Sequence, residues 1–288
     1  MIVVTAANGK IGSRTVRQLA EAHHEVRALV RDPAKASDLA TVAEVVTADL
    51  ADPGALAAAF AGADRVFVIS PLAPQLEAFE ANAFRAAAEA GAKHIVKLSN
   101  FGAGGFPAAP FTWHEASENA LRGLGIPWTI LRPTRFMSDM PFSWDSLTAN
   151  ATLFESTGDS VVTLIDPHDV AAVAATVLTT PGHDGKTYGL TSTEALTGTQ
   201  IAQKISAAIG RPVTFANPSP DEFRETTLAA GVPEPFVDML GQYMALVRQG
   251  GMRVTTTVAD LLGRAPRTFD EWLASNAQAH TQRPTHRP

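Results

Sequence analysis

The feature that most constrains this chain lies in residues 2–12, where an apolar, β-branched run leads directly into a glycine-containing turn. Residues 13–22 then follow a helical pattern, so the sequence predicts a buried strand, a tight turn and a helix. In this context Gly9 lets the backbone approach a pyrophosphate, and Gly12 lets the helix pack closely on the strand. The helix N-terminus adds N–H groups and a partial positive charge. We expect a dinucleotide site here; the alternative is a tight turn alone.

The first half of the chain alternates apolar, strand-like runs with helix-like runs. Repeated βα units of this kind predict an α/β, Rossmann-like fold, in which helices cover both faces of a doubly wound parallel sheet. We expect further strands at residues 25–30, 44–47, 65–69, 94–98 and 128–131, and helices at residues 53–61, 73–90 and 112–124.

Arg31 directly follows the second predicted strand, and Asp32 comes next. In this fold the end of the second strand meets the adenosine ribose, where an acidic residue suits a 2′-hydroxyl and an arginine suits a 2′-phosphate. The planar guanidinium can hold a phosphate through two parallel hydrogen bonds. We therefore expect NADP(H) to be preferred, with NAD(H) as the weaker cofactor. The alternative is a surface arginine paired with Asp32.

Composition narrows the class of protein. The chain is 45% hydrophobic and 18% charged, as in ordinary globular proteins, and its net charge of −6 argues against nucleic-acid binding. The absence of cysteine excludes disulfides, thiol catalysis and cysteine metal sites. The histidines lack ligand spacing, so we expect no metal. Apolar runs are too short to span a membrane, and no basic region precedes the first strand, so we expect a cytoplasmic protein without a signal peptide.

The strand–helix alternation breaks after residue 133. Residues 134–160 are irregular and rich in aromatic and methionine side chains, and are followed by a predicted strand at 161–165 and a helix at 166–180 that returns to the main sheet. Short strands at residues 186–190 and 213–216 and helices at residues 198–208, 220–230 and 235–249 come next. We expect a cofactor domain over residues 1–185 with a substrate-lining insertion near 134–160, a smaller α/β substrate lobe over 186–276, and a flexible tail over 277–288.

Taken in order, several segments resemble the NmrA-like family of atypical short-chain dehydrogenases. The resemblance is strongest to the branch of NADPH-dependent quinone and triphenylmethane-dye reductases, and covers nearly the whole chain. The matching segments are residues 4–12, 28–33, 48–50, 68–71, 98–100, 113–121, 128–133, 165–171 and 263–269. Two departures stand out: Ala6 replaces the usual first glycine, and the Tyr-x-x-x-Lys pair is missing.

The resemblance implies a set of cofactor-binding residues at the carboxyl ends of the strands. Two further assignments in this set have alternatives: Asp49 could be a helix N-cap before Pro53, and residues 70–72 could be a plain loop. The set comprises Ala6, Asn8, Gly9, Lys10, Ile11, Gly12, Arg31, Asp49, Leu50, Ser70, Pro71, Leu72, Asn100, His114 and Pro133.

The expected substrate is a small hydrophobic or aromatic molecule. Phe101, Phe136, Met137 and Phe142 are the residues expected to line its pocket, since such pockets are mostly apolar. Simple packing of Phe101, and a hydrophobic join between the lobes for the other three, are the alternatives. A homodimer is left open.

The missing pair restricts the chemistry. By comparison with ordinary short-chain dehydrogenases, the tyrosine position falls on Pro110 and the lysine position on His114. Proline donates no proton, so we expect a conjugated acceptor that takes hydride without a strong general acid. His114 is the expected catalytic residue, through a hydrogen bond to the nicotinamide ribose or by supplying a proton near neutral pH. The alternative is that it packs beside Trp113.

The sequence therefore predicts an NADPH-dependent oxidoreductase acting on a quinone-like, dye-like or other conjugated small molecule. Two alternatives stay open. One is a non-catalytic, NAD(P)-sensing regulator, as the resemblance to NmrA allows; the other is a reductase of natural-product biosynthesis. The aromatic-rich residues 134–154 favour a substrate cavity and hence an enzyme.

Overall fold

The computed structural model describes residues 1–142, 151–250 and 253–281. The chain divides into two compact units that interleave along the sequence. The first comprises Met1–Pro133, Pro167–Leu190 and Thr257–Arg264, and the second comprises Thr134–Asp166, Thr191–Thr256 and Ala265–Pro288. Apart from the placement of residues 186–190, the domain boundaries expected from the sequence stay a prediction.

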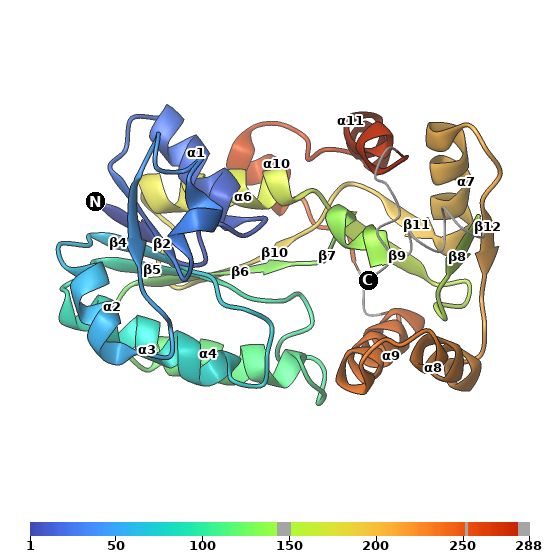
Figure 1. The fold of residues 1–288 in the computed structure, drawn as a ribbon, viewed down its shortest axis with the longest axis horizontal. Coiled ribbons are helices and arrows are strands. Elements are labelled where there is room, and N and C mark those ends of the chain that lie inside the picture. Colours follow the sequence, from blue (N-terminus) through green and yellow to red (C-terminus); the bar gives the residue numbers. More distant parts are fainter. Residues whose placement is uncertain (143–150, 251–252, 282–288) are drawn as a thin grey trace. The chain divides into compact units, whose positions relative to one another are not determined.

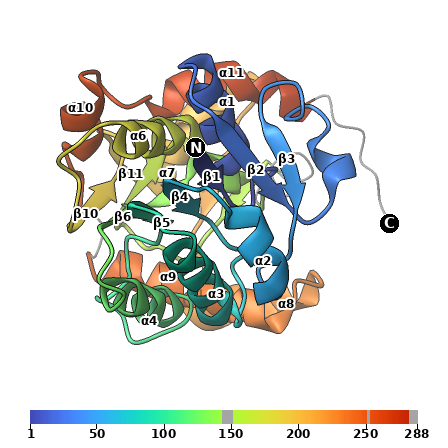
Figure 2. The same ribbon diagram turned by 90° about the vertical axis from the view of Figure 1, so that its left-hand side faces the viewer.

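The first unit is built on a parallel sheet in the order β10-β6-β5-β4-β1-β2-β3 (Figures 1 and 2). This order reverses beside β1, as in doubly wound dinucleotide-binding folds, and confirms the predicted fold class. The strands are β1 (Ile2–Val4), β2 (Val26–Val30), β3 (Glu44–Thr47), β4 (Arg65–Val68), β5 (His94–Leu98), β6 (Trp128–Pro133) and β10 (Lys186–Leu190).

Helices cover both faces of this sheet. In Figure 1, α1 (Gly12–Glu21), α6 (Pro167–Thr179) and α10 (Thr257–Leu262) lie on one face, and α2 (Pro53–Phe60), α3 (Leu76–Glu89) and α4 (Phe111–Arg122) on the other. A short 3-10 helix, η1 (Pro33–Ala36), follows β2. Because both faces are covered, the central strands are almost wholly apolar and buried. Lys97 in β5 is an exception, fully buried although charged.

The position of β10 corrects one expectation. The sequence predicts residues 186–190 in the smaller lobe, but they form an edge strand of the main sheet, with Thr187 opposite Ile130 and Leu190 opposite Pro133 of β6. The physical reason is the crossover through α6: it carries the chain back across the sheet, so that the next strand pairs in parallel with the otherwise unpaired edge of β6.

The second unit has two small sheets and a set of helices. A three-stranded sheet has the order β11-β9-β7, and a two-stranded sheet pairs β12 with β8. The elements are β7 (Arg135–Phe136), η2 (Met137–Phe142), β8 (Thr152–Phe154), β9 (Val161–Ile165), β11 (Ala195–Thr197), α7 (Gly198–Ile209), β12 (Thr214–Ala216), α8 (Pro220–Ala229), α9 (Glu234–Arg248) and α11 (Phe269–Thr281).

The C-terminal segment differs in part from the expectation of a flexible tail. The sequence places the start of the tail at residue 277, whereas α11 continues to Thr281. Residues 282–288 lie outside the described residues. Each helix in the described part of the chain is too short or too polar to cross a lipid bilayer.

Candidate functional site

The turn between β1 and α1 is fixed by one backbone hydrogen bond within the turn and by another to β2. The N–H of Gly9 donates to the Ala6 carbonyl at 2.9 Å, and the N–H of Ala7 donates to the Leu29 carbonyl of β2 at 3.0 Å. Ala6 has a φ of +45°, in the left-handed region where glycine is the usual residue. The turn therefore keeps a glycine-like backbone although alanine stands at its first position.

Gly12 is the residue on which the closeness of this turn depends. A Cβ atom there would lie 2.5 Å from the Ala6 carbonyl oxygen and 2.8 Å from the Ala7 Cα, both of them backbone atoms. The close packing of helix on turn that the sequence predicts is therefore present. No side chain among the described residues caps the N-terminus of α1. Its terminal dipole is thus available to an anion.

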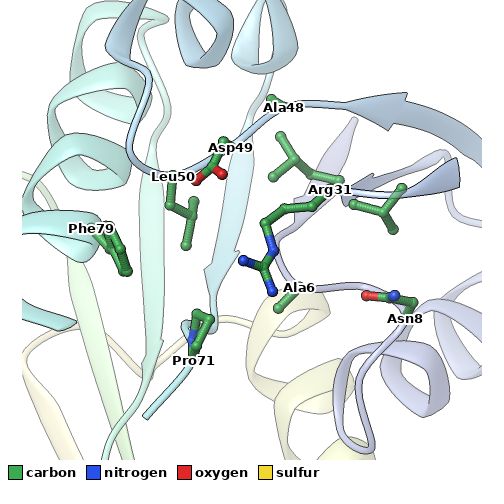
Figure 3. A pocket seen from close by; sticks show the side chains of 10 residues that line it. Ala6, Asn8, Arg31, Ala48, Asp49, Leu50, Pro71 and Phe79 are labelled. Carbon is green, nitrogen blue, oxygen red and sulfur yellow. The ribbon is translucent and has the colours of Figure 1, made fainter. Parts of the chain in front are cut away.

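A pocket opens beside this turn at the carboxyl ends of β1 to β4 (Figure 3). It brings together six of the predicted cofactor residues. Gly9, Lys10, Ile11 and Gly12 belong to the adjacent turn and helix start. The lining residues are Ala6, Asn8, Leu29, Val30, Arg31, Ala48, Asp49, Leu50, Pro71 and Phe79.

Arg31 extends from the end of β2 into this pocket, as Figure 3 shows. The alternative pairing with Asp32 is not present: Asp32 accepts from the Ala34 N–H at 3.1 Å and lies 3.8 Å from the Lys35 ammonium. No ion pair joins Arg31 to another described residue. Its guanidinium is therefore available for a ligand anion.

Asp49 also lines the pocket, and its alternative role is excluded. The N-cap before Pro53 is Asp52, whose carboxylate accepts from the N–H groups of Gly54 and Ala55. The Asp49 carboxylate accepts from the Ala51 N–H at 2.9 Å. Leu50 is buried beside it, so this segment presents one acidic and one apolar side chain to the same pocket.

The remaining predicted cofactor residues lie outside the lining of this pocket. Ser70 donates from its hydroxyl to Glu80 at 2.8 Å, and Leu72 is 49% exposed. Asn100 accepts from the Gly102 N–H at 2.9 Å, and the N–H of Phe101 donates to the Pro133 carbonyl at 3.0 Å. These contacts order the loop after β5 at the carboxyl edge of the sheet. The predicted roles of these residues stay predictions.

His114 lies in the first turn of α4 and is buried, with 8% exposure. Its Nδ1 is 3.4 Å from the ammonium of Lys97, which forms an ion pair with Glu80. Ser117 donates to the same carboxylate. Burial, assisted by the charges of Lys97 and Arg132, holds the pKa of His114 well below its ordinary value. The imidazole is therefore neutral near pH 7, which argues against an imidazolium as the proton source.

A second buried carboxylate, that of Glu118, ties α4 to the neighbouring strands. It accepts from Ser99 at 2.5 Å, from Arg132 at 2.8 and 2.6 Å, and from Arg122 at 2.9 Å. Burial alone would raise the pKa of Glu118, but hydrogen bonds from Arg132 and Ser99 outweigh it and lower this pKa. The carboxylate is therefore charged and fully engaged.

Sequence reasoning missed the Lys97–Glu80 pair. The signal was a lysine inside the apolar run of residues 94–98, because a charge in a central strand requires a buried partner. Its partner, Glu80, lies in the helix α3, and sequence spacing does not reveal that contact.

The expected substrate residues are distributed over both units. Phe101 belongs to the first unit, and Phe136 and Met137 belong to the second. Phe136 is half-buried and Met137 is fully buried. The side chain of Phe142 lies outside the described residues. The pocket wall that these residues are expected to form stays a prediction.

Comparison with known proteins assigns the family. A family described as NAD(P)H-binding matches residues 6–181. This chain belongs to that family. NAD(P)H-family membership agrees with the turn and pocket described above, which lie within the matched residues. The cofactor class expected from the sequence is thereby confirmed.

Three of the similar proteins are named as reductases or oxidoreductases. The chain is 35% identical to an NAD(P)H azoreductase of Xenophilus azovorans, over 97% of this chain and 99% of the relative. It is 37% identical to a (4-alkanoyl-5-oxo-2,5-dihydrofuran-3-yl)methyl phosphate reductase of Streptomyces griseus, again over 97% and 99%. The crystal structure of an NADPH-dependent quinone oxidoreductase of Escherichia coli, complexed with NADPH, matches with a TM-score of 0.90 and 30% identity over 96% of this chain and 99% of that one. The chain is an NAD(P)H-dependent oxidoreductase.

Proposed function

We propose that this protein is an NADPH-dependent reductase of conjugated, electron-poor small molecules. The observation that carries the cofactor part is the Arg31 guanidinium, which forms no ion pair with any described residue and lies in a pocket bordered by the Ala6–Gly12 turn. When bound, NADPH supplies a hydride from its nicotinamide ring. Residues of this chain bind and orient the cofactor and the acceptor and form hydrogen bonds to them.

The turn and the pocket fit a phosphorylated dinucleotide. Gly12 lets α1 approach the turn so closely that a Cβ there would meet its backbone, and the uncapped N-terminus of α1 favours the pyrophosphate. Arg31 would hold the 2′-phosphate through two parallel hydrogen bonds, which gives NADPH its advantage over NADH. Asp49 and Leu50 would contact the adenine. Since the Ser70 hydroxyl is engaged with Glu80, we assign only its backbone to the cofactor groove.

Protonation of the product does not require a strong general acid in the protein. Pro110 occupies the N-cap of α4 where the family tyrosine is expected, so that position offers no proton. A conjugated acceptor spreads the incoming negative charge, and water can protonate its product. His114 is neutral, so its contribution is a hydrogen bond to the ribose or to the acceptor rather than transfer of a stored proton.

The relatives support this substrate class. Azo compounds, quinones and 5-oxo-2,5-dihydrofurans share a π system conjugated to an electron-withdrawing group, and the related enzymes are named for these three. The dihydrofuran relative is a specific reason to keep a second candidate, a reductase of natural-product biosynthesis. Both candidates use the same hydride transfer and differ only in the acceptor.

A panel assay tests the proposal. Oxidation of NADPH would be followed by the loss of its near-ultraviolet absorbance with quinones, azo dyes and a dihydrofuranone phosphate, and with a simple aldehyde and ketone as controls. We expect turnover with one or more conjugated acceptors and none with the simple carbonyls. Turnover restricted to the simple carbonyls would contradict the proposal. Tight NADPH binding without any turnover would instead support the sensor alternative. The cytoplasmic location and the homodimer stay predictions.

A further inference from the structure

A fully buried lysine, Lys97, contacts the residue expected to assist the reaction. Lys97 and Glu80 have side chains with 0% exposure, and the ammonium of Lys97 pairs with the carboxylate of Glu80. The same ammonium lies 3.3 Å from the Leu98 carbonyl and 3.4 Å from Nδ1 of His114. The pair joins three elements, since Glu80 stands on α3, Lys97 on β5 and His114 on α4.

The donor count of the ammonium decides how the imidazole is protonated. A lysine ammonium has three N–H donors and no acceptor, and here three acceptors surround it. The ion pair with Glu80 fixes the direction of one of these donors. Nδ1 of His114 must therefore accept a hydrogen bond and carries no proton of its own. A neutral imidazole in that state holds its N–H on Nε2.

The charges around His114 are consistent with a neutral ring. Lys97 on β5 and Arg132 on β6 are positive, and Glu80 on α3 and Glu118 on α4 are each paired with one of these cations. Burial and the two positive charges lower the pKa of His114 well below its ordinary value. A proton added to Nδ1 would face the Lys97 ammonium directly.

We propose that Lys97 is a positioning residue that holds His114 as the neutral tautomer with its N–H on Nε2, so that His114 offers a hydrogen-bond donor to the bound cofactor or acceptor. This proposal rests on the proposed reductase function. Glu80 supports it by orienting Lys97 through the ion pair, with Ser70 and Ser117 donating to the Glu80 carboxylate. The missing family lysine is thus replaced by a lysine of another element that acts through histidine.

The tautomer is measured directly in the whole protein, without any assay of activity. Imidazole ¹⁵N chemical shifts of ¹⁵N-histidine-labelled protein distinguish an N–H at Nε2 from one at Nδ1 and from the imidazolium. The spectrum of a His114→Asn variant assigns the signal of this residue among the eight histidines. At pH 7 we expect a protonated Nε2 and a bare Nδ1. An N–H on Nδ1, or an imidazolium, overturns the proposal even if every other variant fails to fold.

A double variant tests whether Lys97 imposes that state. Lys97→Met with Glu80→Gln removes both buried charges while keeping similar volume; the glutamine oxygen still accepts from one serine, and its NH2 group can donate to the hydroxyl of the other. We expect His114 to become a mixture of tautomers, and kcat with a poor acceptor to fall about ten-fold while KM for NADPH changes less than about two-fold. The matched control is Lys93→Met with Asp64→Asn, an exposed ion pair at 2.8 Å beside the same strand, which should leave both readouts unchanged.

The two readouts separate this proposal from the proposed function. An unchanged His114 tautomer in the double variant overturns the positioning role. If the double variant loses the Nε2–H tautomer of His114 while kcat stays unchanged, the link between the positioning role of Lys97 and the reaction is overturned. Failure of the reductase proposal itself would be seen in the wild type, as absence of turnover with each conjugated acceptor, while the tautomer measurement remains valid.

Discussion

At the scale of single residues, Arg31 determines the expected choice between the two nicotinamide cofactors. Replacing it in Arg31→Ala should weaken NADPH binding about ten-fold or more and leave NADH binding nearly unchanged. A charge-assisted hydrogen bond contributes about 1.5–3 kcal/mol, and only NADPH carries the 2′-phosphate that would receive it. Calorimetric titration with both cofactors measures this. The control is Arg17→Ala, whose side chain pairs with Asp38 away from the pocket lining. Equal affinity of the wild type for the two cofactors would contradict the assignment.

Gly12 provides a test of the turn itself. A Cβ atom in Gly12→Ala would meet backbone atoms that cannot move away cheaply, so we expect a loss of about 1–3 kcal/mol in stability and at least ten-fold weaker NADPH binding. Gly241→Ala is the matched control, because a Cβ there meets no atom within 4 Å and alanine favours the surrounding helix. Denaturant unfolding and calorimetry compare the two. Normal NADPH binding by Gly12→Ala would exclude this turn as the nucleotide site.

His114 is expected to assist hydride transfer without being essential to it. A positioned acid or base commonly contributes about 10²–10⁴-fold, whereas one hydrogen bond from a neutral ring should contribute less. We therefore expect His114→Ala to lower turnover by about ten-fold with a good hydride acceptor, and by more with an acceptor that needs protonation. Steady-state rates with both acceptor types measure the difference. A thousand-fold loss with each acceptor would make His114 an obligatory acid.

At the scale of elements, Glu118 joins α4 to the carboxyl ends of β5 and β6. Its carboxylate is fully buried and receives hydrogen bonds from Ser99, Arg122 and Arg132. Glu118→Ala should destabilise the protein by about 3–5 kcal/mol, because removing one partner leaves buried donors and charge uncompensated. Urea unfolding measures the loss. Glu115→Ala, a change in the same helix outside this network, should cost far less; equal costs would contradict a special contribution of the Glu118 network, because alanine does not weaken the helix in either variant.

The elements also show how far sequence reasoning extends. The strands of the main sheet and the helices between them were predicted to within a few residues, because each combines a strict apolar period with glycine or proline punctuation. The strand at residues 186–190 was placed in the wrong lobe, since its pairing with β6 is a tertiary contact without a local signal. The short strand β11 and the helices α10 and α11 were missed altogether.

The residues of the candidate site likewise fall into those that the sequence predicted and those that it did not. Arg31, Asp49 and Gly12 were predicted because each directly follows a strand or a turn whose place in the fold is fixed, and all three lie at or beside the pocket. Lys97 and Glu80 were not predicted as a pair, because their contact joins β5 to the preceding helix α3 and has no fixed spacing in the sequence. Burial of two opposite charges together is a property of packing, which a single sequence does not display.

At the scale of the whole molecule, the sheet order gathers residues that are distant in sequence. Ala6, Arg31, Asp49 and Pro71 each follow a different strand, and the parallel arrangement brings all four to one edge (Figure 3). Buried polar side chains on β5 and α4, among them Lys97, His114 and Glu118, interrupt the apolar core of the same unit. The molecule therefore combines a candidate ligand-binding edge with an interior whose stability depends on protonation.

The last prediction concerns that dependence on pH. Burial is the first cause that lowers the pKa of His94, of His114 and of His183 in the folded protein. The unfolded chain therefore takes up protons near pH 6.5 that the folded protein does not. The stability contributed by these neutral rings is fully present above about pH 6.5 and is lost as the pH falls below it, by up to about 1.4 kcal/mol per pH unit for each group. Carboxylates such as Glu118 titrate lower, so a window between about pH 5.5 and 7.5 isolates the histidines.

Urea unfolding at several pH values across that window measures the effect. We expect the free energy of unfolding to fall on acidification, and to fall less steeply in His114→Asn, because that variant removes one group whose protonation is linked to unfolding. The control is His24→Asn, a change at an exposed position, which should keep the wild-type slope. A wild-type stability that is flat or rises between about pH 7.5 and 5.5 would show that these histidines are charged, or exposed, in the folded protein.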